Sequence, residues 1–324
     1  QRAVRAKLVT ISVTIVVPTP KVAAQISENE RQPQKSVLKE ATESLTADPI
    51  SPSFGNAATV EQIASILTGR QPRSVLLVGP SGVGKTAALR ELVRRRDQFG
   101  MSQTDFRATS GARLMAGMSN FGMWQERCQN LCRETSRSGS IVHLGSLLEL
   151  MEVGKCEGNS MGVATFLRPY LVRGALLAVA ECTPEQLSLA ERMFPQVVQA
   201  FEIVRVPEPD AATSRQILNH FAQQFPCPVI RDAEGHERAI ALIDDRGLTA
   251  IERLHRRYAT YSSFPGRPLR FLKNLLRDRF DAIQLRASFT SPAGPALQGI
   301  TEADVIAAFA RETGLPTFLL DDSL

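Results

Sequence analysis

Short apolar segments alternate with segments of helical periodicity over the first two thirds of the chain. Buried strands are predicted at 73–79, 141–144, 174–181 and 201–206, and a strand-like segment at 105–115. Apolar residues at helical spacing predict intervening helices at 59–69, 85–96, 123–138, 161–172 and 184–192. Because strands that alternate with helices form right-handed crossovers, this order predicts a parallel sheet covered on both faces. The expected fold class is therefore α/β, with a three-layer α/β/α sandwich.

The pattern becomes helical throughout after residue 210. Helices are predicted at 211–224, 236–246, 248–260, 267–285 and 301–312. Thr301 with Asp304 resembles a capping box, in which Asp takes the place of the commoner Glu or Gln. These segments predict a second, small, all-helical domain.

The first 56 residues differ from both of these parts. Residues 7–18 are β-branched and partly alternating, which predicts a strand, whereas residues 21–56 are rich in Ser, Pro, Glu and Gln and are interpreted as a linker. The chain begins with Gln1, so we expect it to be a fragment of a longer protein. The predicted organisation is an N-terminal strand and linker, an α/β domain, a helical domain and a tail, at 1–47, 48–210, 211–313 and 314–324.

Composition and charge narrow the class of protein. Of the 324 residues, 43% are hydrophobic and 22% are charged, which is ordinary for a soluble globular protein. The net charge of +5 is dispersed, and its largest block, 90–96, is interpreted as a solvated helix face, which disfavours a nucleic-acid partner. No secretory signal and no apolar run near the roughly 18 residues of a membrane span is visible, so we expect a cytoplasmic protein.

The five cysteines form no recognisable metal or disulfide pattern. Their number is odd, and no two are spaced as CxxC. Cys128 and Cys132 are four apart on a predicted helix, but no second ligand pair with zinc spacing follows. We therefore interpret the cysteines as reduced thiols of a cytoplasmic protein.

A glycine-rich stretch, GPSGVGKT, links the strand at 73–79 to the helix at 85–96 and matches the phosphate-binding P-loop pattern. Glycines allow a tight turn whose N–H groups converge on phosphate oxygens, and the positive end of the helix adds to that field. In this pattern Lys85 reaches the β- and γ-phosphates, and the Thr86 hydroxyl is a Mg²⁺ ligand. The predicted binding residues are Gly79, Pro80, Ser81, Gly82, Val83, Gly84, Lys85 and Thr86.

Further stretches, in order and spacing, resemble the Clp family of AAA+ unfoldases and disaggregases over about residues 48–320. The similar stretches are the two pore-loop segments, the sensor-1 segment, the arginine-finger segment, the sensor-2 helix and the end of the first ATPase module, at 117–131, 151–176, 180–187, 189–210, 266–276 and 300–316. The resemblance implies a P-loop NTPase fold with a helical lid, and ATP with Mg²⁺ as cofactors. It also implies assembly of identical chains into a ring, expected to be a hexamer, that acts on a protein substrate or partner.

Three site residues follow from this resemblance. Thr183 falls on the sensor-1 position, which orients the attacking water or reads the γ-phosphate. Arg192 falls on an arginine finger, which in the family reaches the nucleotide of the neighbouring subunit; the second finger position holds Met193. Arg267 matches the sensor-2 arginine of the lid, which would convert nucleotide state into lid movement.

The pore loop departs from the family pattern. The tyrosine that grips an extended polypeptide aligns with Asn120, although Phe121 and Met118 are near it. Either these two side chains grip a polypeptide in its place, or the loop has no threading role.

A second departure concerns hydrolysis. The strand at 141–144 ends in Gly145 and Ser146, where the family has an Asp that holds the Mg²⁺ shell and a Glu that polarises water. General-base help is typically worth about 10²–10⁴-fold in rate, so its loss predicts binding with slow hydrolysis. Glu149 and Glu152, just beyond, are candidates for a displaced acid, and we interpret His143 as a buried, hydrogen-bonded histidine.

Several functions fit these residues. The leading hypothesis is an ATP-binding Clp-type module that assembles into a nucleotide-dependent ring for protein remodelling or regulation and hydrolyses ATP poorly. The alternatives are an active unfoldase that uses a displaced acid and a DNA-directed loader or regulator. A regulatory scaffold is a further reading, which the sequence does not separate from the first.

Overall fold

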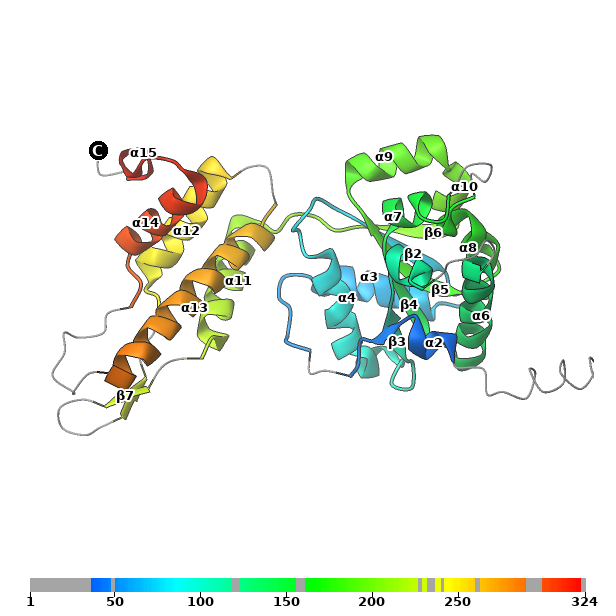
Figure 1. Cartoon of the computed structure of the whole chain (residues 1–324), viewed down its shortest axis with the longest axis horizontal. Helices are drawn as coiled ribbons and strands as arrows, with labels where there is room; N and C mark the ends of the chain where they lie inside the picture. Colours follow the sequence, from blue (N-terminus) through cyan, green and yellow to red (C-terminus); the bar gives the residue numbers. More distant parts are fainter. Residues whose placement is uncertain are drawn as a thin grey trace, which may run out of the picture.

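The computed structural model shows an α/β domain and a helical lid (Figure 1). It describes residues 36–47, 50–117, 123–155, 161–226, 229–231, 237–239, 242–259, 263–289 and 299–321. The α/β domain contains a six-stranded sheet in the order β1-β3-β4-β5-β2-β6. Its strands are β1 (Glu43–Ser44), β2 (Ser74–Val78), β3 (Phe106–Ala108), β4 (Ile141–Ser146), β5 (Leu177–Cys182) and β6 (Phe201–Arg205).

The sheet is parallel except at one edge. Strands β3, β4, β5, β2 and β6 pair in parallel, whereas the two-residue strand β1 pairs antiparallel with β3. Strand β2 lies between β5 and β6 and is buried at all five positions, which is why it reads as a continuous apolar run. The α/β prediction is confirmed.

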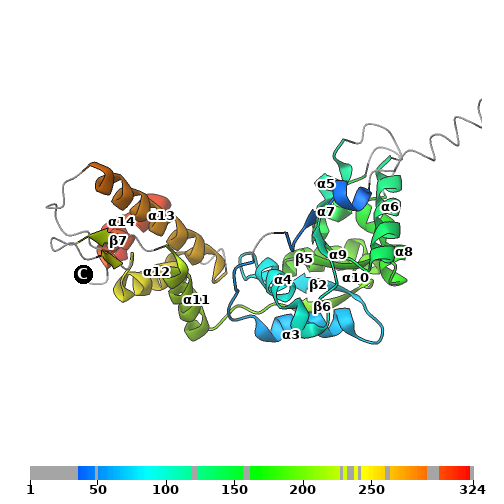
Figure 2. The same cartoon turned by 90° about the horizontal axis from the view of Figure 1, so that it is seen from below.

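Helices cover both faces of the sheet (Figures 1 and 2). Val75 and Leu77 of β2 pack into a core with α3 (Ala57–Thr68) and α4 (Lys85–Arg94), whereas Leu76 and Val78 face the opposite core. The short 3-10 helix Arg96–Phe99 follows α4. The opposite core is built from α6 (Met123–Ser138), α7 (Leu147–Glu152), α8 (Val163–Val172), α9 (Pro184–Met193) and α10 (Pro195–Val198).

Two segments near the sheet edge differ from the sequence prediction. Residues 36–47, which composition assigned to the linker, form α2 (Val37–Glu40) and the edge strand β1. The strand-like segment 105–115 is a strand only to Ala108, and then becomes helix α5 (Gly111–Met115), because the Ser110 side chain caps it by accepting from Arg113 N at 3.2 Å. The strand predicted at 7–18 lies outside the described residues.

The lid packs five helices around its own apolar core. These are α11 (Ala211–Gln224), α12 (Asp245–Tyr258), α13 (Gly266–Phe289), α14 (Glu302–Thr313) and α15 (Thr317–Leu320). The predicted capping box of Thr301 and Asp304 is present at the start of α14. None of the helices in the described ranges is both long enough and apolar enough to span a bilayer.

The lid also contains a two-stranded antiparallel sheet, so it is not wholly helical. Strand β7 (Val229–Arg231) pairs with β8 (Glu237–Ala239). The helix predicted over 236–246 is therefore wrong at 237–239, and α12 begins only at Asp245, capped by the Asp244 side chain. Pairing with strand β7 overrides the high helix propensity of Glu237, Arg238 and Ala239.

The lid meets the α/β domain at the glycine-rich loop. The amide of Ser263 donates to Ser81 O at 3.1 Å, and the amide of Gly266 donates to Gly82 O at 2.9 Å. A Cβ on Gly266 would lie 2.5 Å from Gly82 O, so the close approach of the two backbones requires glycine. This contact places the start of α13 directly beside the site described next.

Candidate functional site

The GPSGVGKT loop turns sharply between the end of β2 and the start of α4. Gly82 and Gly84 adopt φ of +86° and +102°, a left-handed region that residues with a side chain rarely enter. A Cβ on Gly79 would meet Val206 O at 2.6 Å. The loop conformation therefore depends on these three glycines, as the sequence predicts.

Lys85 folds back over this loop. Its Nζ donates to Gly79 O at 2.6 Å and to Pro80 O at 2.9 Å. Burial lowers the pKa of Lys85, while the negative charge of Glu181 opposes that shift. A half-buried ammonium group held at the N-terminus of a ten-residue helix is suited to bind an anion such as phosphate.

Thr86 and Glu181 face each other across the site. The Thr86 hydroxyl lies 2.9 and 3.1 Å from the two carboxylate oxygens of Glu181, and His143 Nε2 lies 2.9 Å from Glu181 Oε1. Burial opposes ionisation of Glu181, but the hydrogen bond and charge of His143, the hydrogen bond from Thr86 and the charge of Lys85 together lower its pKa. Glu181 is therefore held as a carboxylate, which accepts from Thr86 Oγ1–H and from His143 Nε2–H.

These groups line one cavity of about 470 Å³, here termed the phosphate cavity. Its wall includes Ser81, Gly82, Gly84, Lys85, Thr86, Ala87, His143, Gly145, Ser146, Glu181, Cys182, Thr183 and Gln186. A hydroxyl and a carboxylate are oxygen ligands of the kind that Mg²⁺ prefers, and the ammonium group offsets phosphate charge. No group of three or more His, Cys, Asp or Glu residues in the described part of the chain forms a dedicated metal cage. The donor set suits Mg²⁺ that arrives with phosphates and keeps several waters.

The end of β4 is altered in shape as well as in sequence. Gly145 adopts φ of +72°, and the pairing with β5 shifts register between His143 and Gly145. Ser146 then caps α7, since its Oγ accepts from Glu149 N at 3.4 Å. An Asp or Glu side chain at position 145 would have to adopt this left-handed conformation, so the bulge favours glycine.

The two acids that follow β4 are engaged outside the cavity. Glu149 Oε1 accepts from the amide of Ala112 at 2.7 Å, and Glu152 Oε1 pairs with Lys155 Nζ at 2.8 Å. Neither residue lines the cavity. The structure therefore does not bring the two candidate displaced acids to the phosphate loop.

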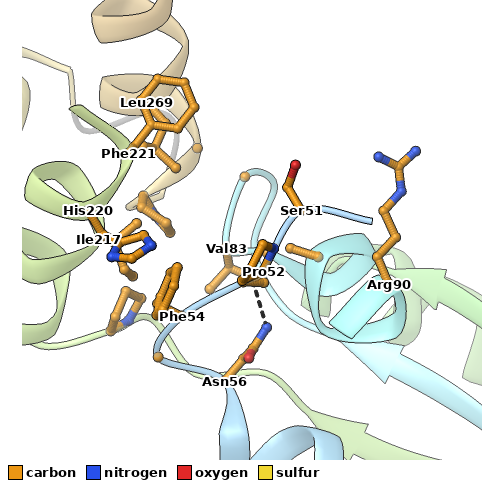
Figure 3. Close-up of a pocket in the computed structure, with 18 of the residues that line it drawn as sticks. Ser51, Pro52, Phe54, Asn56, Val83, Arg90, Ile217, His220, Phe221 and Leu269 are labelled. Carbon is orange, nitrogen blue, oxygen red and sulfur yellow. Dashed lines mark hydrogen bonds between the residues drawn. The ribbon is translucent and has the colours of Figure 1, made fainter. Parts of the chain in front are cut away.

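A second, more apolar cavity of about 540 Å³ adjoins the first and shares Gly82 and Gly84 with it. It lies between residues 51–56, helix α4 and helices α11 and α13 of the lid (Figure 3). Phe54 and His220 approach each other across it, with ring centroids 3.6 Å apart. A largely apolar cavity beside a phosphate loop can hold a nucleobase, so this second cavity is termed the base cavity.

Sequence reasoning missed three of these residues, namely Glu181, Phe54 and His220. The signal for Glu181 was a single acid near the end of the apolar segment 174–181, at the sheet edge where ligands of α/β proteins bind. Phe54 was a large apolar residue inside the polar segment 21–56. No comparable sequence signal marks His220.

The three residues assigned by resemblance occupy different places. Thr183 lines the phosphate cavity and caps α9, since its side chain accepts from Gln186 N at 3.3 Å. Arg192 is exposed in the last turn of α9, outside both cavities. Arg267, near the start of α13, lies 3.7 Å from Glu312 within the lid and lines neither cavity. The pore-loop residues Met118, Asn120 and Phe121 lie outside the described residues.

The described cysteines are free and buried. Burial raises the pKa of Cys128 and of Cys132 to about 12, and that of Cys182 to about 11. Cys182 lines the phosphate cavity as a neutral thiol, because the thiolate would have to form in a poorly solvated place.

Comparison with known proteins gives ClpB chaperones among the relatives of this chain. The chain is 27% identical over 285 residues to chaperone protein ClpB 2 of Parasynechococcus marenigrum, which covers 86% of this chain and 29% of the relative. It is 26% identical over 256 residues to chaperone protein ClpB of Bacteroides thetaiotaomicron, covering 77% of this chain and 28% of the relative. The chain thus spans less than a third of the length of these curated relatives. No family model matches it.

Solved structures of the same fold are similar to the chain. A Saccharomyces cerevisiae Hsp104–ADP complex superposes with a TM-score of 0.65 at 20% identity, over 88% of this chain and 47% of that one. Hsp104 in complex with casein gives a TM-score of 0.64 at 19% identity, over the same shares. At this level of identity the likeness shows the fold, and the site's chemistry rests on the residues described above.

Proposed function

The chain is a Clp-type AAA+ module, and from that premise we propose that it binds ATP with Mg²⁺ between its sheet and its lid and hydrolyses the nucleotide slowly. The observation that carries this proposal is the pairing of a complete phosphate loop with a β4 end, at Gly145 and Ser146, that bears no carboxylate. Binding and turnover depend on different groups, and only the first set is complete here.

The residues present suit the phosphates, the metal ion and the base of the nucleotide. Lys85 and the loop amides bind the phosphates, and the Thr86 hydroxyl is the Mg²⁺ ligand. The cavity between Phe54 and the lid takes the base, and it borders the phosphate cavity at Gly82, Gly84 and Ala87. Bound Mg²⁺ would neutralise the charge that develops between the β- and γ-phosphates.

Slow turnover follows from the missing base. A carboxylate that activates water typically contributes about 10²–10⁴-fold to the rate. Neither Gly145 nor Ser146 can accept that proton, and Glu149 and Glu152 are engaged elsewhere. ATP then acts mainly as a ligand that stabilises one arrangement of the lid and of neighbouring chains.

The proposed assembly and partners are inferred from the relatives of this chain. The relatives are named chaperones, and one Hsp104 structure contains casein. We propose that copies of this chain form a ring, expected to have six members, in which exposed Arg192 reaches the nucleotide of the adjacent copy. Such a ring would remodel or regulate a protein partner.

The basic block 90–96, which spans the end of α4 and the start of the 3-10 helix, gives little support to the alternative of DNA binding. Arg94 pairs with Glu91 at 2.6 Å, and Arg95 Nε donates to Gln98 at 2.8 Å. Arg96 donates to Val93 O at 3.1 Å. Local partners of this kind leave fewer cations available for phosphate contacts, and salt-dependent DNA binding would revive this alternative.

One experiment tests the proposed function. ATP and Mg²⁺ are titrated into the wild type, Lys85→Ala and the matched control Lys155→Ala, and phosphate release is followed on the same samples. We expect saturable binding in the wild type and in the control, loss of binding in Lys85→Ala, and little phosphate release throughout. Absence of binding in the wild type, or turnover at the rate of an active ATPase that Lys85→Ala abolishes, would contradict the proposal.

A further inference from the structure

We infer that Glu181, on strand β5, supplies the carboxylate of the Mg²⁺ site that the end of β4 lacks, and that His143 positions it. This inference rests on the proposed function and deepens it. It assigns the metal-binding carboxylate to strand β5, which lies next to β4 in the sheet.

The order of strands in the sheet places Glu181 at the carboxyl-terminal edge, beside the phosphate loop. Strand β5 lies between β4 and β2, and Glu181 is paired in register with Ser146 on one side and Leu77 on the other. It thus stands at the carboxyl end of the sheet, between the strand that has lost its acids and the strand that leads into the phosphate loop. A side chain from this position needs to cross only one strand spacing to reach helix α4.

The contact with Thr86 places a hydroxyl and a carboxylate, two oxygen groups that could hold Mg²⁺, side by side. Thr86 Oγ1 lies within 3.1 Å of both carboxylate oxygens of Glu181. When the hydroxyl proton points at the carboxylate, the oxygen lone pairs remain available for a cation. The carboxylate adds a full negative charge beside the hydroxyl, of the kind that Mg²⁺ sites use together with substrate phosphates.

His143 fixes the orientation of that carboxylate. It projects from β4, and its Nε2 lies 2.9 Å from Glu181 Oε1. The His143 and Glu181 side chains are only 13% and 15% exposed, so few other orientations are open to them. Strand β4 thus contributes to the metal site through a neighbouring side chain. Outer-shell partners of this kind commonly set the orientation of a metal ligand.

No competing acid is present among the described residues of the cavity wall. Glu181 is the one Asp or Glu in the set that lines it, whereas Glu149 and Glu152 bind Ala112 and Lys155. Glu181 is also a wall of an open cavity beside Lys85 and is not sealed in the apolar core. One carboxylate takes the place of two, so the metal site is complete while the base for water remains absent.

The experiment measures how much Mg²⁺ tightens nucleotide binding, a quantity independent of turnover. ATP affinity is determined with Mg²⁺ and with EDTA for the wild type, Glu181→Gln and the matched control Glu152→Gln, whose side chain is exposed and lies outside the cavity. We expect Mg²⁺ to tighten binding in the wild type and in the control. Glu181→Gln should lose about tenfold or more of that gain, as for a charged hydrogen-bond partner, while its affinity in EDTA stays near that of the wild type.

Two further variants test separately the charge at position 181 and the positioning role of His143. Glu181→Asp retains the charge on a shorter stem, and should give an intermediate gain from Mg²⁺. His143→Asn should raise the Mg²⁺ concentration needed for half of the gain without changing affinity in EDTA, which a merely structural residue would not do. Thermal unfolding of each variant without ligand identifies any that has lost its fold, and the remaining ones carry the test.

The outcomes separate the two proposals. Equal gains from Mg²⁺ in the wild type, Glu181→Gln and Glu181→Asp would overturn the role of Glu181 and leave nucleotide binding standing. Absence of ATP binding in the wild type, with or without Mg²⁺, would overturn the proposed function and this inference with it.

Discussion

The backbone amide of Gly266, the first residue of lid helix α13, donates to the carbonyl oxygen of Gly82 in the phosphate loop over 2.9 Å. The lid is thus joined to the loop by main-chain atoms, which cannot move apart without breaking a hydrogen bond. A change in the shape of the loop, such as one caused by bound phosphate, would therefore displace the start of helix α13. This contact gives a physical route from nucleotide state to lid position.

The first prediction tests that contact with Gly266→Ala. The added Cβ would lie 2.5 Å from Gly82 O, so the lid helix must shift away from the loop. Overpacking of this kind costs about 1–3 kcal/mol, and we expect both a lower unfolding temperature and weaker ATP binding. Gly69→Ala is the control, because its nearest contact is 3.1 Å, to Ser65 O, away from both cavities. Equal ATP affinity in Gly266→Ala and the control would contradict the link.

The second prediction concerns the base cavity and uses Phe54→Ala. Loss of an aromatic wall beside His220 should weaken ATP binding by about 0.5–1.5 kcal/mol, or roughly threefold to tenfold. Binding of inorganic triphosphate should be unchanged, because it needs only the loop. Phe318→Ala, at an exposed position in α15, is the control. A parallel loss of both ligands would show that Phe54 acts on the loop and not on the base.

The sequence was most informative where local pattern and tertiary environment agree. Buried β2, the glycine loop and α4 follow from apolar runs and backbone freedom, and all three are found where predicted. The strands of Glu237–Ala239 and Glu43–Ser44 were missed because their partners, β7 and β3, are supplied by other segments. Strands of two or three residues carry too little pattern of their own.

Within the candidate site, the local motif could be predicted from the sequence, whereas contacts between distant segments could not. The phosphate loop is a contiguous motif, so it can be recognised from the sequence alone. The Glu181 contact depends on the order of strands in the sheet and on a bulge at Gly145, neither of which the sequence displays. The base cavity joins residues 51–56 to α11 and α13, more than 150 residues away along the chain. Sites of this kind become visible only when the packing is known.

The third prediction concerns the thiols. The pKa of Cys128 and Cys132 is raised to about 12, and that of Cys182 to about 11, so almost no thiolate exists near pH 8. We expect these three cysteines to resist alkylation by iodoacetamide in the native protein and to react promptly in denaturant, as read by peptide mass spectrometry. Rapid native labelling of Cys128 or Cys132 would show that the core around α6 opens readily.

The last prediction follows from a histidine buried in the lid. His255 donates through Nδ1 to Ile251 O at 2.8 Å and lies 5.1 Å from the rings of both Phe271 and Phe309. Burial, with a smaller contribution from the charge of Arg267, lowers its pKa from 6.5 to about 4. Between these two pH values the folded state binds fewer protons than the unfolded state. The contribution of neutral His255 to the free energy of unfolding is therefore full above pH 6.5 and is lost as the pH falls towards 4.

The full effect of His255 is about 3 kcal/mol, since each unit of pKa corresponds to about 1.4 kcal/mol. Denaturant unfolding at pH 7, 5.5 and 4.5 measures it in the wild type, in His255→Phe and in His220→Gln, a half-buried histidine in the base cavity. Phe removes the proton-binding group while filling similar space among Phe271 and Phe309, so its stability should fall less between pH 7 and pH 4.5. His220→Gln is the control for removal of a histidine elsewhere in the lid. If His255→Phe shows the slope of the wild type, the acid sensitivity of the lid has another source, because a group that no longer binds protons cannot contribute to it.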